Sequence, residues 1–261
     1  MTNLNKNELA KIGVQFGNLV RKWNPKMRPY IYGKTKNRTH ILNLKKIADS
    51  CQEVGNYINS IVKKNKTILF LCTKKTSLKN KTKNIPEEQD KKHPFEIVKE
   101  QAIRCGMPYI VNKWEGGFLT NFEETKRKLR ELQRLNIFVK KDTFKSLTKK
   151  EQAKYKERQD ELKNIYEGVI DLKEKKPDVL FIIGLNKEKT AFREVIKAKI
   201  PVIAVCNNNC NPKLVDYVIP GNDEKSEPIN FFASLVADAI IQAKGEAKSV
   251  AENTAVNKKL E

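Results

Sequence analysis

The residues of this chain whose types and spacing best suit chemistry lie in one basic and aromatic stretch near its start. From residue 9 to residue 48 there is no acidic residue, yet ten residues are Lys or Arg. Two prolines lie among them, together with the aromatic residues Phe16, Trp23, Tyr30 and Tyr32. Positive side chains can neutralise phosphates and flat rings can stack on bases, so this composition indicates a nucleic-acid interface.

The net charge of the whole chain supports the same class of partner. The 261 residues carry a formal charge of +21, and the isoelectric point is near 9.7. A nucleic-acid partner is the simplest interpretation, and an anionic membrane surface is the second. No apolar run approaches the ~18 residues that a membrane span needs. The N-terminus has no signal-peptide pattern, and the odd number of five cysteines favours reduced thiols in a cytosol-like compartment.

Motifs for catalysis or cofactor binding are missing from the sequence. Neither a G-x-x-x-x-G-K-[ST] loop nor a G-x-G-x-x-G turn is present. The two histidines, His40 and His93, have no nucleophile or carboxylate at a suggestive spacing, and we expect His40 to be a packed strand residue. Cys206 and Cys210 could supply two zinc ligands, but the C-x-x-C spacing of zinc knuckles is absent. We therefore expect no enzyme activity, no cofactor and no metal.

The apolar pattern predicts the elements that must position these residues. Near-continuous aliphatic runs, typical of strands buried on both faces, occupy 40–44, 67–72, 178–183 and 201–206, with shorter ones at 109–112 and 216–219. Helical patterns alternate with them at 45–64, 95–105, 187–198 and 227–244. This alternation predicts an α/β fold, a Rossmann-like three-layer sandwich with a mostly parallel sheet.

Residues 120–173 break this alternation and predict an inserted antiparallel coiled-coil hairpin. Two capping boxes, Thr120-x-x-Glu123 and Thr148-x-x-Glu151, each open a helix with a heptad stripe, and residues 140–147 join the two helices. A pair of ordinary crossover helices on the sheet is the alternative. The α/β domain then comprises 1–119, with a basic N-terminal extension, and 174–244. We expect a long polar loop at 73–94 and an unstructured tail at 245–261.

A series of short motifs resembles a known family. Among them are Trp23-Asn-Pro-Lys-Met27, Pro29-Tyr-Ile-Tyr-Gly33, Gly116-Gly-Phe-Leu-Thr-Asn121 and Pro220-Gly-Asn222. Over about residues 8–243 the chain resembles the bacterial-type second protein of the small ribosomal subunit, the universal uS-two family. The resemblance implies a Rossmann-like domain with a coiled-coil insertion. It also implies binding to small-subunit rRNA and to neighbouring ribosomal proteins, in cytoplasmic or organellar ribosomes, without catalysis, membrane attachment or homo-oligomers.

The chain departs from the pattern of this family at several positions. Many members have His where Gln15 and Asn18 stand, Asp where Gly184 and Cys206 stand, and Leu where Glu115 stands. The His and Asp residues could form a metal or polar node, to which a large S1-domain protein docks. Their replacement puts both the metal and that partner in doubt. Residues 76–93 are an insertion relative to typical members.

With this resemblance, we predict that the RNA-binding residues come from three places. These are the 21–38 segment, which Pro25 and Pro29 should hold extended, the residues after the strand 67–72, and the residues before the Gly116–Gly117 pair. For each ring, packing against the sheet is the alternative. A nucleotide- or dinucleotide-dependent enzyme and a free single-strand RNA binder remain alternative functions. The predicted RNA-binding residues are Arg21, Lys22, Trp23, Asn24, Lys26, Arg28, Tyr30, Tyr32, Lys34, Lys36, Arg38, Lys74, Lys75, Lys113 and Trp114.

Overall fold

The centre of the protein is a parallel β-sheet. The structure is a computed structural model that describes residues 6–74, 92–172 and 175–257. Five strands pair in parallel in the order β5-β4-β6-β7-β8. They are β4 (Ile68–Leu71), β5 (Tyr109–Ile110), β6 (Val179–Ile183), β7 (Val202–Cys206) and β8 (Tyr217–Pro220). The predicted parallel sheet is confirmed.

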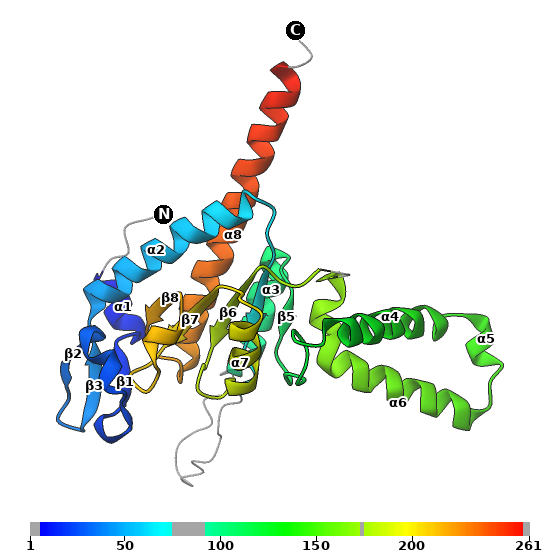
Figure 1. Cartoon of the computed structure of the whole chain (residues 1–261), viewed down its shortest axis with the longest axis horizontal. Helices are drawn as coiled ribbons and strands as arrows, with labels where there is room; N and C mark the ends of the chain where they lie inside the picture. The colour runs from blue at the N-terminus through cyan, green and yellow to red at the C-terminus, as the bar shows by residue number, and fades with distance from the viewer. Residues whose placement is uncertain (1–5, 75–91, 173–174, 258–261) are drawn as a thin grey trace.

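The strands are buried because helices cover both faces of the sheet (Figure 1). Along β4, Ile68 and Phe70 enter one core while Leu69 and Leu71 enter the other, as side-chain alternation requires. Helices α1 (Lys6–Ile12), α2 (Leu44–Val62), α3 (Pro94–Cys105) and α8 (Ser226–Asn257) build the first core. Helix α7 (Lys189–Lys197) and the loop after β5 build the second. The result is the three-layer α/β sandwich that the sequence predicts.

A second, antiparallel sheet lies beyond the β8 edge (Figure 1). Its order is β1 (Phe16–Leu19), β3 (Thr39–Leu42) and β2 (Ile31–Lys34). The prediction that the 40–44 run is a doubly buried strand of the main sheet was wrong. In β3 only His40 and Leu42 are buried, because they face the core while their neighbours face outward. The expectation of an extended 21–38 segment was also wrong in part. The segment contains two 3-10 helices, η1 (Val20–Lys22) and η2 (Pro25–Tyr30). Pro25 is the first residue of η2, where the N–H that proline lacks would have no helical partner.

A helical hairpin projects from the opposite edge, beyond β5 (Figure 1). We call residues 121–172 the arm. It comprises α4 (Phe122–Phe138), α5 (Asp142–Lys145), α6 (Lys149–Tyr166) and the 3-10 turn η3 (Glu167–Leu172). The capping box of Thr148 and Glu151 is present, whereas the predicted box at Thr120 is not, because α4 begins one residue later with Asn121 as its N-cap.

The C-terminal end differs from the sequence-based expectation. Helix α8 runs to Asn257, so the segment from Gly245 continues the helix instead of being unstructured, which its alanine and glutamate content favours. A further 3-10 turn, η4 (Pro212–Leu214), links β7 to β8. Most of the expected 73–94 loop lies outside the described residues. Among the helices described, none combines the length and the apolar composition required to span a bilayer.

Candidate nucleic-acid interface

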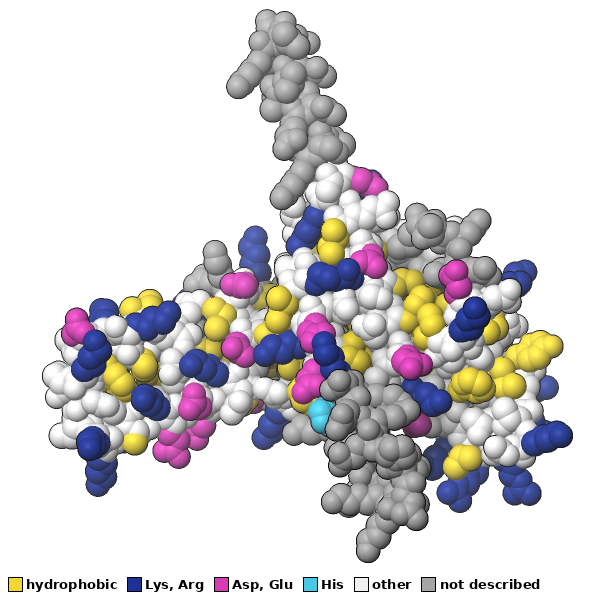
Figure 2. Space-filling view, turned by 180° about the vertical axis from the view of Figure 1, so that it is seen from behind, with side chains coloured by type: hydrophobic (Ala, Val, Ile, Leu, Met, Phe, Trp, Pro, Cys, Tyr) yellow, Lys and Arg dark blue, Asp and Glu magenta, His cyan; other side chains and the backbone are white. Residues whose placement is uncertain are grey.

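The N-terminal sheet and its two 3-10 turns present a one-signed surface, which Figure 2 shows at its right as a group of basic side chains. This surface includes Tyr32, which is 78% exposed. No residue from 9 to 48 is acidic, so no carboxylate of this segment offsets the charge. The exposed cations that the predicted set has in this segment are Arg21, Lys22, Lys26, Arg28, Lys34, Lys36 and Arg38.

The other two predicted rings of this segment are partly used for packing. Trp23 is half-buried and meets the His40 ring edge-on, with centroids 5.4 Å apart. Tyr30 is half-buried against the second core, with the Lys46 ammonium 5.6 Å from its ring centre. Tyr32 is therefore the ring of this segment that has most of its surface open to a base.

Two asparagines fasten this sheet to the end of β7, and the sequence analysis missed them. The Asn18 amide N–H donates to Asn208 Oδ1 at 3.0 Å and to Asn207 Oδ1 at 3.2 Å. In return, Asn208 Nδ2 donates to the Asn18 carbonyl at 2.8 Å, and the Asn24 amide N–H donates to the Asn208 carbonyl at 2.8 Å. The side chain of Asn24 caps η2. The sequence signal was the run Asn207–Asn209 directly after a strand.

His40 belongs to this amide joint and not to a catalytic group. Its Nδ1 lies 2.9 Å from Asn208 Nδ2. Burial, with a smaller contribution from Lys34, lowers the pKa of His40. A neutral ring can then accept the amide proton at Nδ1. The expectation of a packed, hydrogen-bonded His40 is confirmed.

The predicted cations outside the N-terminal sheet have different environments. The Lys74 ammonium donates to the Asp223 carbonyl at 2.5 Å and lies 3.3 Å from the carboxylate of the same residue. Its charge is thus matched inside the fold. Lys113 is exposed, and Lys75 lies outside the described residues.

Trp114 packs in the fold instead of facing solvent. It is only 9% exposed, and its Nε1 donates to Glu194 of α7 at 3.2 Å. The same buried carboxylate accepts the amide N–H groups of Gly117 at 2.8 Å and Leu119 at 3.0 Å. Gly117 has a φ of +91°, which favours glycine and turns the backbone toward Glu194. This carboxylate joint is the packing alternative that the sequence left open, and Glu194 was not singled out.

The crevice where open α/β sheets bind nucleotides holds a buried carboxylate in this protein. That crevice lies at the carboxyl ends of β4 and β6, where the strand order reverses. There the buried Glu188 carboxylate accepts the Thr73 amide N–H at 2.9 Å and also the Thr73 hydroxyl. A carboxylate at this point repels a phosphate, so the arrangement does not suit a nucleotide.

The residues at the node of the family do not suit a metal either. Asn18, whose backbone N–H takes part in the amide joint, offers a neutral amide side chain at this place. Cys206 and Cys210 are buried, and their mutual hydrogen bond together with burial raises the pKa of Cys206 well above its usual value, which keeps its thiol protonated. Within residues 6–74, 92–172 and 175–257, no group of three or more His, Cys, Asp or Glu side chains could hold a metal ion.

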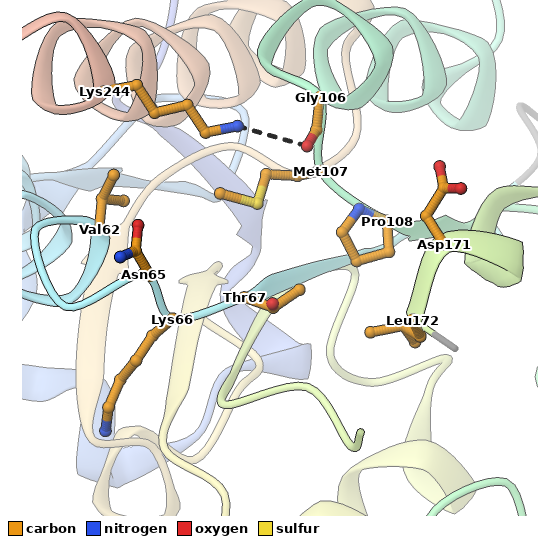
Figure 3. A pocket seen from close by; sticks show the side chains of 10 residues that line it. All are labelled: Val62, Asn65, Lys66, Thr67, Gly106, Met107, Pro108, Asp171, Leu172 and Lys244. Carbon is orange, nitrogen blue, oxygen red and sulfur yellow. Dashed lines mark hydrogen bonds between the residues drawn. The ribbon is translucent and has the colours of Figure 1, made fainter. Parts of the chain in front are cut away.

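A hollow of about 250 Å³ lies at the amino-terminal ends of β4 and β5, the end of the sheet opposite the nucleotide crevice (Figure 3). Three charged residues line it: Lys66, Asp171 and Lys244. Lys244, on α8, donates to the carbonyl of Cys105 at 2.7 Å and to that of Gly106 at 3.4 Å. Those carbonyls belong to the C-terminus of α3, where a cation is stabilising. We therefore interpret this hollow as a helix-end joint.

Comparisons with known proteins agree with this geometry. The family model described as "Ribosomal protein S2" matches residues 9–243. A protein of a Nitratiruptor species named "Small ribosomal subunit protein uS2" is 39% identical over 237 residues, 91% of this chain and 82% of its own length. The protein of the same name from Endomicrobium trichonymphae is 34% identical over 94% of this chain and 92% of its own length. The chain therefore belongs to the ribosomal protein S2 family.

Proposed function

We propose that this chain is a structural constituent of the small ribosomal subunit, and that its N-terminal sheet binds small-subunit rRNA. The observation that carries the proposal is the acid-free 9–48 segment, in which seven predicted cations and the ring of Tyr32 are exposed. The two relatives named above carry the name of a small-subunit protein. Neutralising several phosphates makes RNA affinity fall steeply with salt.

Within this proposal the chain has no catalytic role. It works as a single copy beside rRNA and neighbouring ribosomal proteins, in cytoplasmic or organellar ribosomes. The Glu188 carboxylate in the nucleotide crevice supports this against a dinucleotide-dependent enzyme. Saturable dinucleotide binding at physiological salt would reverse that conclusion. An S1-domain protein is the weakest of the candidate partners, because Gln15, Asn18, Gly184 and Cys206 stand where many members of the family have His and Asp.

The test is charge reversal at Arg28, Lys34 and Arg38 in cells that express the tagged chain. These side chains are exposed, so the fold should persist while the cation cluster loses its attraction for phosphates. We expect the variant to be lost from the small-subunit fraction of a sucrose gradient. The matched control reverses Arg193, Lys197 and Lys199, exposed cations on and beside α7, and should still sediment with the subunit.

Either of two results would contradict the proposal. Normal incorporation of the N-terminal variant would remove the RNA-anchor assignment. A wild-type chain that stays at the top of the gradient would favour the alternative of a free single-strand RNA binder.

A further inference from the structure

The distal part of the arm has a different charge from the rest of it. We call residues 139–156 the arm end. It carries seven lysines and two acidic residues, a net charge of +5, whereas residues 121–138 and 157–172 together sum to −1. A solvated helical hairpin does not require its charge to concentrate at one end. The lysines are Lys140, Lys141, Lys145, Lys149, Lys150, Lys154 and Lys156.

Beside these charges is an open groove of about 440 Å³ between α4 and α6. Leu135, Ile137, Phe138 and Tyr155 form its apolar lining, and Arg134 and Lys141 lie at its rim. A carboxylate that also lines the groove, Glu131, is paired with Arg158 through contacts of 2.8 and 3.2 Å. Figure 2 shows the arm at its left, with hydrophobic side chains exposed among basic and some acidic ones.

Part of the apolar lining stays exposed although the two helices pack against each other. Leu129, Leu132 and Leu162 are buried in the core between the arm and the body, as the heptad pattern predicts. In contrast, Ile137 is 60% and Tyr155 40% exposed. Exposed apolar side chains that gather around one groove, next to cations, are typical of a binding site.

The aromatic rings of the groove are held in fixed orientations. Phe138 meets Tyr155 at a centroid distance of 5.2 Å and an interplanar angle of 60°, and it meets Phe144 at 5.9 Å and 83°. Phe144 is buried beneath the turn, so it fixes Phe138, which in turn supports Tyr155. A supported ring loses little conformational freedom when a flat ligand stacks on it.

We propose that the arm end is a second RNA-binding site, in which the groove takes an unpaired nucleobase and the surrounding lysines neutralise the adjacent phosphates. Charge complementarity selects RNA, because the arm end is strongly positive and the one acidic residue of the groove is already paired. The exposed face of Tyr155 and the planar guanidinium of Arg134 suit a base. This inference rests on the proposed RNA-binding function but assigns a different surface.

The test is photocrosslinking of the purified full-length chain to an oligouridylate of about 12 nucleotides that carries 4-thiouridine. Mass spectrometry of the peptides reports the arm end and the N-terminal sheet separately. For wild type we expect crosslinks at both. Tyr155→Leu keeps helix propensity and apolar volume but loses the ring, so the concentration needed for half-maximal crosslinking at the arm end should rise about tenfold.

Two controls separate stacking from charge and from misfolding. A duplex of the same length should be unaffected by Tyr155→Leu, because its bases are already stacked, whereas Lys149→Gln with Lys150→Gln should weaken arm-end crosslinking to both RNAs. A second groove variant, Arg134→Gln, should weaken the single-stranded arm-end crosslink. Helical circular dichroism of every variant should match that of wild type.

The inference is overturned if Tyr155→Leu leaves arm-end crosslinking unchanged, or if wild type crosslinks only through the N-terminal sheet. Either result would favour a protein, and not RNA, as the partner that binds the groove. The proposed function fails separately, if crosslinks to the N-terminal sheet are absent.

Discussion

The arm and the N-terminal sheet are attached at opposite edges of the same parallel sheet, and different chemistry holds each of them (Figure 1). At the arm, the Glu194 carboxylate accepts three N–H groups from the segment that leads into α4. At the N-terminal sheet, the amide of Asn208 both donates to and accepts from the backbone of Asn18. At the arm, three N–H donors share one charged acceptor, the Glu194 carboxylate. At the N-terminal sheet, a neutral side-chain amide exchanges two hydrogen bonds with the backbone, as a neighbouring strand does.

The choice of a carboxylate in one joint and an amide in the other follows from the charge of the surface beside each joint. A carboxylate makes strong, charge-assisted hydrogen bonds, but it adds negative charge to its surroundings. Under a surface that has to attract phosphates, such a charge would act against binding. Asp223, a carboxylate beside the amide joint, accepts from Asn207 and is paired with Lys74. The two asparagines of the amide joint thus hold the cationic sheet through neutral groups and add no negative charge of their own.

The largest expected effect on stability comes from removing the Glu194 carboxylate. Glu194→Ala leaves Trp114 Nε1 and the amide N–H groups of Gly117 and Leu119 without their acceptor in a buried place. We expect a loss of about 3 kcal/mol in the free energy of unfolding, measured by urea denaturation, because each unsatisfied buried donor is costly. Glu194→Gln retains one acceptor oxygen and should lose less.

The control for this prediction is Glu157→Ala, an exposed carboxylate of α6, which should change the free energy by no more than about 0.5 kcal/mol. If Glu194→Ala were as stable as this control, the Gly117–Leu119 segment would be held by packing alone.

Removing the Asn208 side chain from the amide joint should cost less stability, and its effect should be confined to the N-terminal sheet. Asn208→Ala removes the side-chain bonds to Asn18 and to His40, and we expect a loss of about 2 kcal/mol. Hydrogen exchange should quicken in β1, β2 and β3 while the amides of α4 and α6 keep their protection. Asn164→Ala, which changes an exposed amide on α6 outside the joint, serves as the control. Faster exchange throughout the chain would contradict the idea of two separate joints.

Much of this architecture could be predicted from the sequence, and the reasons differ between the two regions. The doubly buried strands are nearly continuous aliphatic runs, and the heptads of α4 and α6 are regular, so both patterns identify their elements. The place of β3 could not be predicted, because a four-residue strand carries too little periodicity to distinguish two sheets. The roles of Trp114 and Lys74 could not be predicted either, because the partner of each lies far away in the sequence. Glu194 is 80 residues from Trp114, and Asp223 is 149 residues from Lys74.

The smallest expected effect concerns the carboxylate of Glu115. This side chain lies where the arm meets the body and accepts hydrogen bonds from Lys128 and from the Tyr166 hydroxyl. Partial burial alone would raise the pKa of Glu115, but these bonds outweigh it and lower the pKa below its usual value. A lowered pKa means that the stabilisation is present above the pKa of the unfolded state and is lost as pH falls through that of the folded state.

Glu115→Leu should therefore cost about 1 kcal/mol at neutral pH and less in acid, measured as denaturant midpoints across the range from pH 7 to pH 3. Glu115→Gln keeps the hydrogen-bonding shape without the charge and should flatten the same pH dependence. The N-terminal sheet is the internal reference, since its amide joint does not include Glu115. If both variants followed the wild-type pH profile, the arm would owe its attachment to Glu194 and to the close approach of Gly168 to Tyr109, where a Cβ would come within 2.3 Å of the Tyr109 carbonyl oxygen.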